Sequence, residues 1–325
     1  MKRALLASFV AMFVMATCLG LYLYFALPRQ NPPADITVSQ SAEKVERGRY
    51  LAEYVVLCND CHTKRDWSLY GGPVISPVVA GRECLTGEVK LVGIRVKDDN
   101  VPGVLCIRNL TSDRRSGLGK WSDGEIIRAM REGIDRRGHA LFPIMPYSVY
   151  RMISDEDAAA LVAYMRKLKP VKTNWIGKGI EFPMGLLTQL WPRPLNWPVE
   201  APDRSNSVLY GAYLTKIARC EYCHTKRRKY GRNLAPESRY AGGVLFEVDG
   251  KQVYSTNLTP HESGLKNMSR EEFIAMFKSY SEPQPVPPEG NTPMDWSAYA
   301  GMTEEDLGAI YDFLRVRRSV DTSSD

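Results

Sequence analysis

The sequence has no run in which apolar and polar residues alternate for long enough to predict a substantial β-sheet. It also lacks any stretch that resembles a nucleic-acid-binding module, and its net charge of +6 is mild for 325 residues. Histidine is scarce, with four in the whole chain. We therefore predict an all-α protein with no nucleic-acid partner, whose basic balance suits a membrane surface or an acidic protein partner. Its 21 prolines and 25 glycines indicate many turns rather than disorder.

One long apolar run is present, at the N-terminus. Two basic residues precede an uncharged stretch from Ala4 to Leu27, which is long enough to cross a bilayer as a helix. A cleaved signal peptide is a second interpretation, with Val14-Met15-Ala16 as a passable cleavage site, but the apolar run continues past it. A lipoprotein signal at Cys18 is a third, although the residue before it is bulkier than usual. We favour an uncleaved anchor over 1–28 and a Pro-rich polar linker over 29–43.

The rest of the chain repeats itself. Each copy has a Gly-x-Tyr-Leu helix segment, a CxxCH motif, an Asn-Leu-Thr segment, a capping box that opens a middle helix, a Pro-bracketed methionine and a final helix. In chain order, the two sets of matching segments begin at Gly48 and Gly211, Cys58 and Cys220, Asn109 and Asn257, Ser122 and Ser269, Met145 and Met294, and Ser154 and Thr303. The spacing of apolar residues after each cap predicts helices.

The CxxCH motif is the attachment signature of haem c. Two thiols reach the two vinyl groups of one porphyrin, and the adjacent histidine supplies the proximal ligand. A redox CxxC pair or half of a zinc site would explain one such motif, but not two at the same place in a helical repeat. We predict two covalently bound haem c groups, held by Cys58, Cys61 and His62 and by Cys220, Cys223 and His224.

The sixth ligand of each iron is predicted to be a methionine. Met145 and Met294 each lie in a Pro-bracketed loop just before the final helix of their copy, whereas most other methionines lie on predicted helices. Thioether opposite imidazole fills the sixth position and raises the reduction potential. The alternative is a bis-histidine site that uses His139 or His261, but these two histidines do not occupy matching places in the repeat.

The proximal imidazoles also need a partner for their second nitrogen, usually a backbone carbonyl. Pro73 and Pro236 follow their histidines at similar distances, and we expect these carbonyls to serve.

Two further cysteines, Cys84 and Cys106, belong to neither motif. In an exported protein two spare cysteines usually form a disulfide, and we predict one here. Two separate buried thiols are the alternative.

The region 44–318 resembles the tandem cytochrome c units in the cytochrome subunits of alcohol and gluconate dehydrogenases. The matching stretches are CHTKRD, NLTSDRRSGLGKWSDGEIIRAMREG, MPYSVYRMISDEDAAALVAYMRKL and their second-copy counterparts. The resemblance implies a class I cytochrome c fold in each unit and a role in carrying electrons from a periplasmic dehydrogenase toward quinone or an oxidase. It also implies haem attachment on the outer side of the membrane, and hence a single-pass protein of a bacterial inner membrane with its haem domains in the periplasm. Those subunits typically bear three haems, whereas this chain has two motifs.

We therefore expect two tandem class I cytochrome c domains behind a transmembrane helix. The function expected is electron transfer from a dehydrogenase or respiratory complex to a cytochrome, quinone or terminal oxidase, rather than catalysis. One alternative is a dihaem enzyme that oxidises a thiosulfate-like substrate or reduces peroxide, and another is a structural haem protein. The predicted organisation is an anchor, a linker, a first haem domain, a packed aromatic segment, a second haem domain and a polar tail, at 1–28, 29–43, 44–170, 171–207, 208–320 and 321–325.

Basic residues follow both haem motifs, at Lys64-Arg65 and at Lys226 to Lys229. They are either a solvated face or a docking rim for an acidic redox partner.

Overall fold

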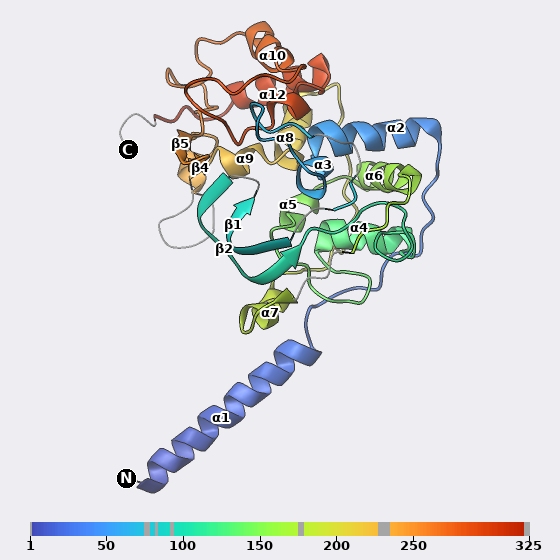
Figure 1. The fold of residues 1–325 in the computed structure, drawn as a ribbon, viewed down its shortest axis with the longest axis vertical. Coiled ribbons are helices and arrows are strands. Elements are labelled where there is room, and N and C mark those ends of the chain that lie inside the picture. The colour runs from blue at the N-terminus through green and yellow to red at the C-terminus, as the bar shows by residue number, and fades with distance from the viewer. Residues whose placement is uncertain are drawn as a thin grey trace.

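A computed structural model describes residues 2–74, 79–81, 84–91, 94–174, 179–226 and 235–321. The helix α1 (Lys2–Phe25) projects as a rod from a helical head (Figure 1). This helix is long and apolar enough to cross a membrane. Almost all of it is exposed, and Leu23 near its end is the residue it buries.

The two copies of the repeat have matching helices. The first copy contains α2 (Ala42–Tyr50), which continues into a π-helical turn (Leu51–Val55), and then α3 (Cys58–His62), α4 (Asp123–Glu132), α5 (Tyr147–Tyr150) and α6 (Asp155–Lys167). The second contains α8 (Ser207–Ile217), α9 (Cys220–Cys223), a 3₁₀ turn (Pro236–Ser238), α10 (Arg270–Lys278), α11 (Trp296–Tyr299) and α12 (Glu304–Arg315). Ser122 and Ser269 form the predicted capping boxes, which confirms the sequence pattern.

In each copy the first helix crosses the last helix at close range. A Cβ on Gly48 of α2 would overlap the Ala160 carbonyl oxygen of α6, and a Cβ on Gly211 of α8 would overlap the Ala309 carbonyl oxygen of α12. Glycine is therefore required at both positions by the approach of the partner helix. The Gly-x-Tyr-Leu repeat seen in the sequence is the mark of this crossing.

The head also contains a sheet, which the sequence analysis did not predict. The strands β1 (Cys84–Leu91) and β2 (Ile94–Cys106) pair antiparallel, and β2 also pairs with β3 (Gly179–Ile180) and β4 (Leu245–Val248). The last strand, β5 (Lys251–Tyr254), pairs with β4. The expectation of a purely helical fold is wrong in this respect. The β2–β4 pair joins the two copies of the repeat, and no local pattern indicates a pairing of such distant segments.

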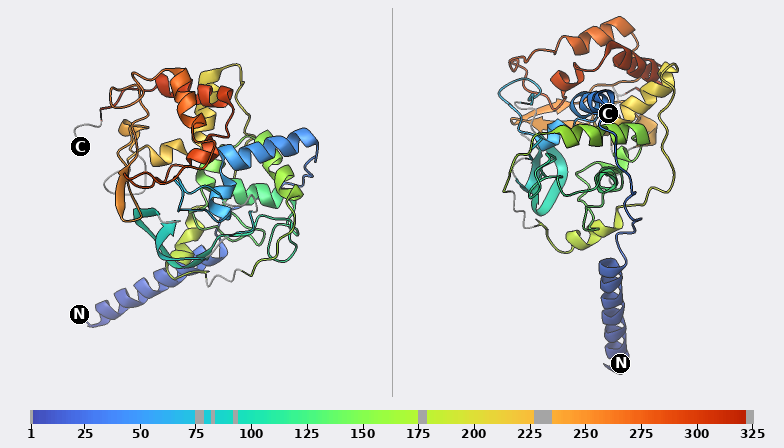
Figure 2. Two further views of the ribbon diagram at one scale, coloured as in Figure 1. Left: turned by 45° about the horizontal axis from the view of Figure 1, so that its top comes forward. Right: turned by 90° about the vertical axis from the view of Figure 1, so that its right-hand side faces the viewer.

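The largest apolar core is shared by both copies. One cluster contains Leu51 and Leu161 from the first copy and Leu214, Phe273 and Leu314 from the second. The views in Figure 2 agree that α8 and α12 lie against the first copy rather than apart from it. The two copies therefore pack directly on each other.

The expected linker over 29–43 and the expected packed segment over 171–207 both contact mainly the first copy. In the stretch before α2, Val38 is buried, its N–H donates to Asp123 at 2.7 Å, and Arg128 donates to the Asn31 carbonyl. The segment over 171–207 includes α7 (Met184–Leu187) and a 3₁₀ turn (Thr188–Leu190).

Its aromatic side chains are not buried between the copies as expected. Phe182 is 84% exposed and Trp197 is 60% exposed, while Trp175 lies outside the described residues. The expectation of a buried aromatic segment is therefore wrong for Phe182 and Trp197. The two copies bury their shared surface through helices, so these two rings are not needed to cover it.

Candidate functional site

Each CxxCH motif begins with the same unusual backbone turn. Leu57 and Arg219, the residues just before the first cysteine, both adopt left-handed conformations, with φ of 58° and 62°. Such φ values are uncommon for residues with a side chain and cluster at functional sites. The short helix α3 begins after this turn and contains both cysteines and His62, and α9 begins after the equivalent turn, contains both cysteines and is followed directly by His224.

The Nδ1 atom of each motif histidine meets a backbone carbonyl. His62 Nδ1 lies 2.6 Å from the Arg108 oxygen, and His224 Nδ1 lies 2.8 Å from the Thr256 oxygen. Because a carbonyl only accepts, Nδ1 is the protonated nitrogen and Nε2 keeps its lone pair for a metal. Burial lowers the pKa of His224 despite this bond, which favours the neutral, ligating form.

The carbonyls that hold the histidines lie directly before the repeated Asn-Leu-Thr segments. Asn109 Oδ1 accepts from the N–H of Thr111 at 2.8 Å, and Asn257 Oδ1 accepts from the N–H of Thr259 at 2.8 Å. The same amides donate to chain that follows the final helices, at Val171 and Val320. These asparagines therefore fix the segment that presents each carbonyl.

The expectation that the carbonyls of Pro73 and Pro236 serve this purpose is wrong. The Pro73 carbonyl instead accepts from the N–H of Asp66. The two prolines were chosen because they lie a short way after their histidines. The segment that contacts each imidazole lies much later in the chain.

Two glycines that the sequence analysis missed also brace the histidines. The N–H of Gly81 donates to the His62 carbonyl at 3.0 Å, and the N–H of Gly242 donates to the His224 carbonyl at 2.8 Å. Each follows an alanine, and this repeated Ala-Gly pair could have revealed them.

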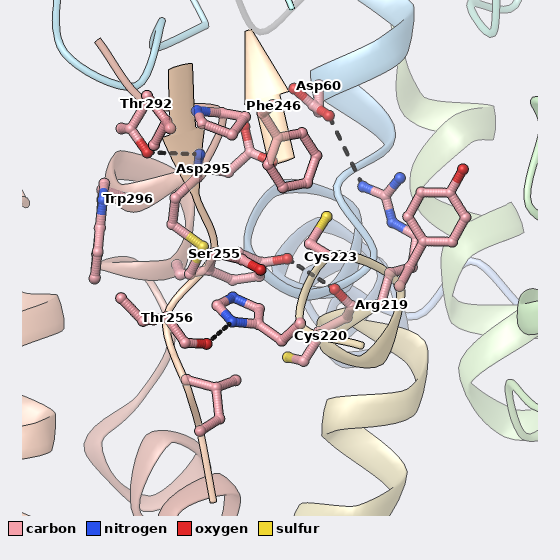
Figure 3. A pocket seen from close by; sticks show the side chains of 18 of the residues that line it. Asp60, Arg219, Cys220, Cys223, Phe246, Ser255, Thr256, Thr292, Asp295 and Trp296 are labelled. Carbon is pink, nitrogen blue, oxygen red and sulfur yellow. Dashed lines mark hydrogen bonds and ion pairs between the residues drawn. The ribbon is translucent and has the colours of Figure 1, made fainter. Parts of the chain in front are cut away.

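The second motif opens onto a cavity of about 1160 Å³. Cys220, Cys223, His224 and Met294 all line it. Most of the remaining wall is apolar or aromatic: Leu258, Leu265, Phe273, Phe277, Trp296, Tyr299, Leu307, Ile310 and Leu314. In Figure 3 Cys220, Cys223 and Arg219 lie on one side of this cavity, and Thr292, Asp295 and Trp296 on the other. A paired thiol, an imidazole and a thioether on an apolar cavity form a donor set that fits haem c.

The first motif lies beside the same cavity. Cys61 and Asp60 line its edge, while Cys58 and Met145 pack against the shared apolar core. Burial raises the pKa of the Cys58 and Cys220 thiols to about 12 each, so both thiols are neutral. Both predicted methionines lie in equivalent turns, in which the methionine carbonyl accepts from the residue two positions later, Tyr147 or Trp296.

Comparison with known proteins gives dehydrogenase subunits and a cytochrome among the relatives. The chain is 32% identical over 254 residues to a protein of Pseudomonas putida that is part of nicotinate dehydrogenase, a match that covers 75% of this chain and 19% of that protein. It is 26% identical to the gluconate 2-dehydrogenase cytochrome c subunit of Pantoea cypripedii, over 86% of this chain and 60% of that relative. A protein named diheme cytochrome c-type from Cereibacter sphaeroides is 27% identical over 80% of both chains.

The chain is a homologue of dehydrogenase cytochrome c subunits. It spans less than two thirds of the length of the dehydrogenase subunits it matches. No protein-family model matches it. The similarity supports electron transport by a haem- and iron-containing cytochrome, as the sequence analysis predicted.

The other predicted features of this cytochrome have mixed outcomes. Cys84 and Cys106 form the predicted disulfide, at the open end of the β1–β2 pair. His139 is exposed and lies 3.7 Å from Asp135, and His261 pairs with Ser263 in its own loop. The two alternative histidines are thus engaged locally.

The basic rim is only partly as expected. Lys64 is exposed, but the Arg65 side chain is 4% exposed and pairs with Asp60 and, at 2.5 Å, with Asp295. A docking role for Arg65 is therefore wrong, because its guanidinium joins the first haem motif to the second methionine loop. The residues Arg227 to Lys229 lie outside the described residues.

Proposed function

We propose that this chain is a membrane-anchored dihaem c-type cytochrome. It transfers electrons from a periplasmic dehydrogenase or respiratory complex to a downstream cytochrome, quinone or terminal oxidase. The observation that carries this proposal is the duplicated arrangement of two thiols and an imidazole whose Nδ1 donates to a backbone carbonyl. The second copy of that arrangement shares its cavity with Met294.

Each haem site has its own ligand set in this proposal. Cys58 and Cys61 attach the first haem and His62 and Met145 ligate it, whereas Cys220, Cys223, His224 and Met294 hold the second. Bound haem supplies a one-electron iron couple. The carbonyl behind each imidazole raises its basicity as a ligand, and the apolar wall keeps water from the sixth position.

The two units form one rigid relay rather than two independent beads. Support comes from the position of Cys61, which lines the cavity that also contains Cys220 and Cys223. Further support comes from Arg65, which bridges Asp60 of the first motif and Asp295 of the second methionine loop. A fixed separation matters because electron tunnelling falls steeply with distance. The proposed units are 44–170 and 208–320, each a class I cytochrome c domain.

The chain is proposed to be anchored by α1, with the head in the periplasm. The apolar helix supports a membrane location, and the basic residues before it favour a cytoplasmic N-terminus. Release of the intact protein from membranes by carbonate or high salt would contradict the anchor.

The direct test of function is isolation of the native protein from membranes. We expect a dehydrogenase to co-purify with the chain. We also expect the substrate of that dehydrogenase to reduce the two haems at the same rate as each other. Carbon monoxide added to the reduced protein is expected to bind slowly and incompletely, because both sixth positions are filled. Rapid stoichiometric binding at one haem would favour the catalytic alternative and overturn the carrier function.

A further inference from the structure

We propose that the apolar surface around α7, made by Phe182, Leu187, Leu190 and Trp191, is embedded in the outer-leaflet interface of the membrane. We call these four residues the α7 surface. The inference rests on the proposed anchor and gives the head a second point of attachment to the same bilayer.

The four side chains of the α7 surface are apolar, yet they are exposed to solvent. Phe182 is 84% exposed and Leu190 is 50% exposed, and Leu187 and Trp191 are each 37% exposed. Apolar side-chain area left in water is unfavourable in proportion to its size. A cluster of large apolar side chains within one short segment therefore marks an interaction site rather than scattered surface residues.

The position of this surface identifies the occupant. α7 and the 3₁₀ turn after it contact α1, and Leu23 in the last turns of α1 is 6% exposed while its neighbours are open. Figures 1 and 2 place α7 at the end of the head nearest to α1. If α1 spans the bilayer, its last turn lies where hydrocarbon gives way to headgroups, and the α7 surface lies at that depth.

The surrounding side chains have the chemistry of a membrane interface. Tyr22, Tyr24 and Phe25 are exposed at the same end of α1, and aromatic rings are enriched at this level of a bilayer. Arg29 is exposed directly after them. Arg137 is also exposed, in a loop whose Gly138 carbonyl accepts from the Gln30 side chain at 3.3 Å. Guanidinium groups beside aromatic rings suit phosphate headgroups, which they bind through paired hydrogen bonds.

Attachment at two points would fix the tilt of the head. α1 alone attaches the head to the bilayer at one point, whereas a second contact restricts the tilt of the head relative to the membrane plane. Trp191 belongs to the α7 surface, lines the haem cavity and contacts Phe142 edge-on, with ring centroids 6.5 Å apart. The membrane contact would therefore hold the second haem site in a defined orientation to membrane-bound redox partners.

The test uses the full haem-loaded chain in vesicles of phosphatidylcholine with a minority of phosphatidylglycerol. Cys18, which is free, is first replaced by serine. Nitroxide labels are then attached through single substitutions Phe182→Cys, Leu190→Cys, Met12→Cys and Val316→Cys. Val316 is 63% exposed and directly follows α12, a helix that lies in the part of the head away from α1 (Figure 1), so it is the aqueous control. Met12 reports insertion of α1.

Collisions of each label with oxygen and with a water-soluble nickel chelate are measured by power saturation, with nitrogen as the baseline for each label. We expect the labels at 182, 190 and 12 to collide more with oxygen than with nickel, and the label at 316 to show the reverse. Labels at 182 and 190 that behave like the one at 316, while 12 remains in lipid, would overturn the inference and leave the anchor intact. A nickel-accessible label at 12 would overturn both. Shielding of 182 and 190 from both reagents would show that a protein partner or a second copy covers the surface, which also overturns it.

Discussion

Single hydrogen bonds decide which nitrogen of each motif histidine is available to iron. In both copies the Nδ1 proton is committed to a carbonyl, at Arg108 or Thr256. The ring is therefore held in one tautomer and one orientation before any ligand arrives. The equal geometry in two separate places indicates that this is a property of the repeat and not of one loop.

The ligand proposal predicts the behaviour of methionine variants. Met145→Ala and Met294→Ala should each remove part of the weak far-red absorption band of ferric, methionine-ligated haem, because each vacates one sixth position. Met152→Ala is the matched control, since Met152 is 47% exposed and follows Met145 by only a few residues. The measurement is the absorption spectrum of the oxidised protein. An unchanged band in both ligand variants would refute the assignment.

At the scale of elements, the crossings of α2 with α6 and of α8 with α12 organise the head. Gly48 and Gly211 let the backbones touch, so each amino-terminal helix is fixed against the final helix of its own copy. This contact positions the motif that follows each amino-terminal helix. The sheet acts differently, because β2 joins β4 and thereby links the two copies.

The close crossing of α8 with α12 predicts that one added methyl group strongly lowers the stability of the protein. Gly211→Ala should lower the free energy of unfolding by about 1–3 kcal/mol, because the new Cβ meets the Ala309 carbonyl oxygen, which cannot move without the helix. The measurement is denaturant unfolding followed by haem absorbance. Gly308→Ala in α12 is the control, because its Cβ would meet only the flexible end of Arg270. Equal effects of the two changes would contradict the role of the close approach.

Across the whole molecule, the two copies exchange equivalent tyrosine contacts. The Tyr50 hydroxyl donates to Asp306 at 2.7 Å and accepts from the N–H of Thr303, at the start of α12. The Tyr213 hydroxyl donates to Asp157 at 2.7 Å and accepts from the N–H of Ser154, at the start of α6. Each copy therefore caps the final helix of the other, which makes separation of the copies costly.

These contacts predict that Tyr50→Phe and Tyr213→Phe each destabilise the protein by about 1–3 kcal/mol, because each change removes two hydrogen bonds and deprives a buried carboxylate of its hydroxyl donor. The double variant should in addition become more sensitive to proteolysis between the two copies. Tyr254→Phe is the control, because Tyr254 is 59% exposed. Stability is measured by denaturant titration, and a double variant as resistant as the parent would argue against the reciprocal caps.

The Tyr50 effect should also depend on pH. Burial raises the pKa of Asp306, and the Tyr50 hydroxyl opposes that rise. Without Tyr50 the folded-state pKa rises further above the unfolded value, so the variant gains more stability than the parent as pH falls through that pKa. The stability gap between Tyr50→Phe and the parent should therefore narrow on acidification. A gap that widens would contradict the assigned role of the hydroxyl.

Features with a local cause could be predicted from the order of the residues alone. The CxxCH spacing, the capping boxes at Ser122 and Ser269, and the apolar run of α1 each depend on residues a few positions apart. The internal repeat extended that reach, since two copies of a weak pattern point to the same helix more firmly than one. The spare pair Cys84 and Cys106 could be matched because every other cysteine lies in a haem motif or in the apolar N-terminal run.

Features that depend on contacts between distant segments became visible only in the folded protein. The carbonyls of Arg108 and Thr256 contact histidines that lie 46 and 32 residues away in the sequence. No sequence pattern near the histidines predicts these contacts. Arg65 looked like a surface cation until the second copy brought Asp295 to it. The segment 171–207 was predicted to pack its aromatic residues, but the two copies pack directly on each other and Phe182 stays exposed. In each case the contact forms because segments that are distant in the sequence pack on one another, and a local sequence pattern does not indicate such packing.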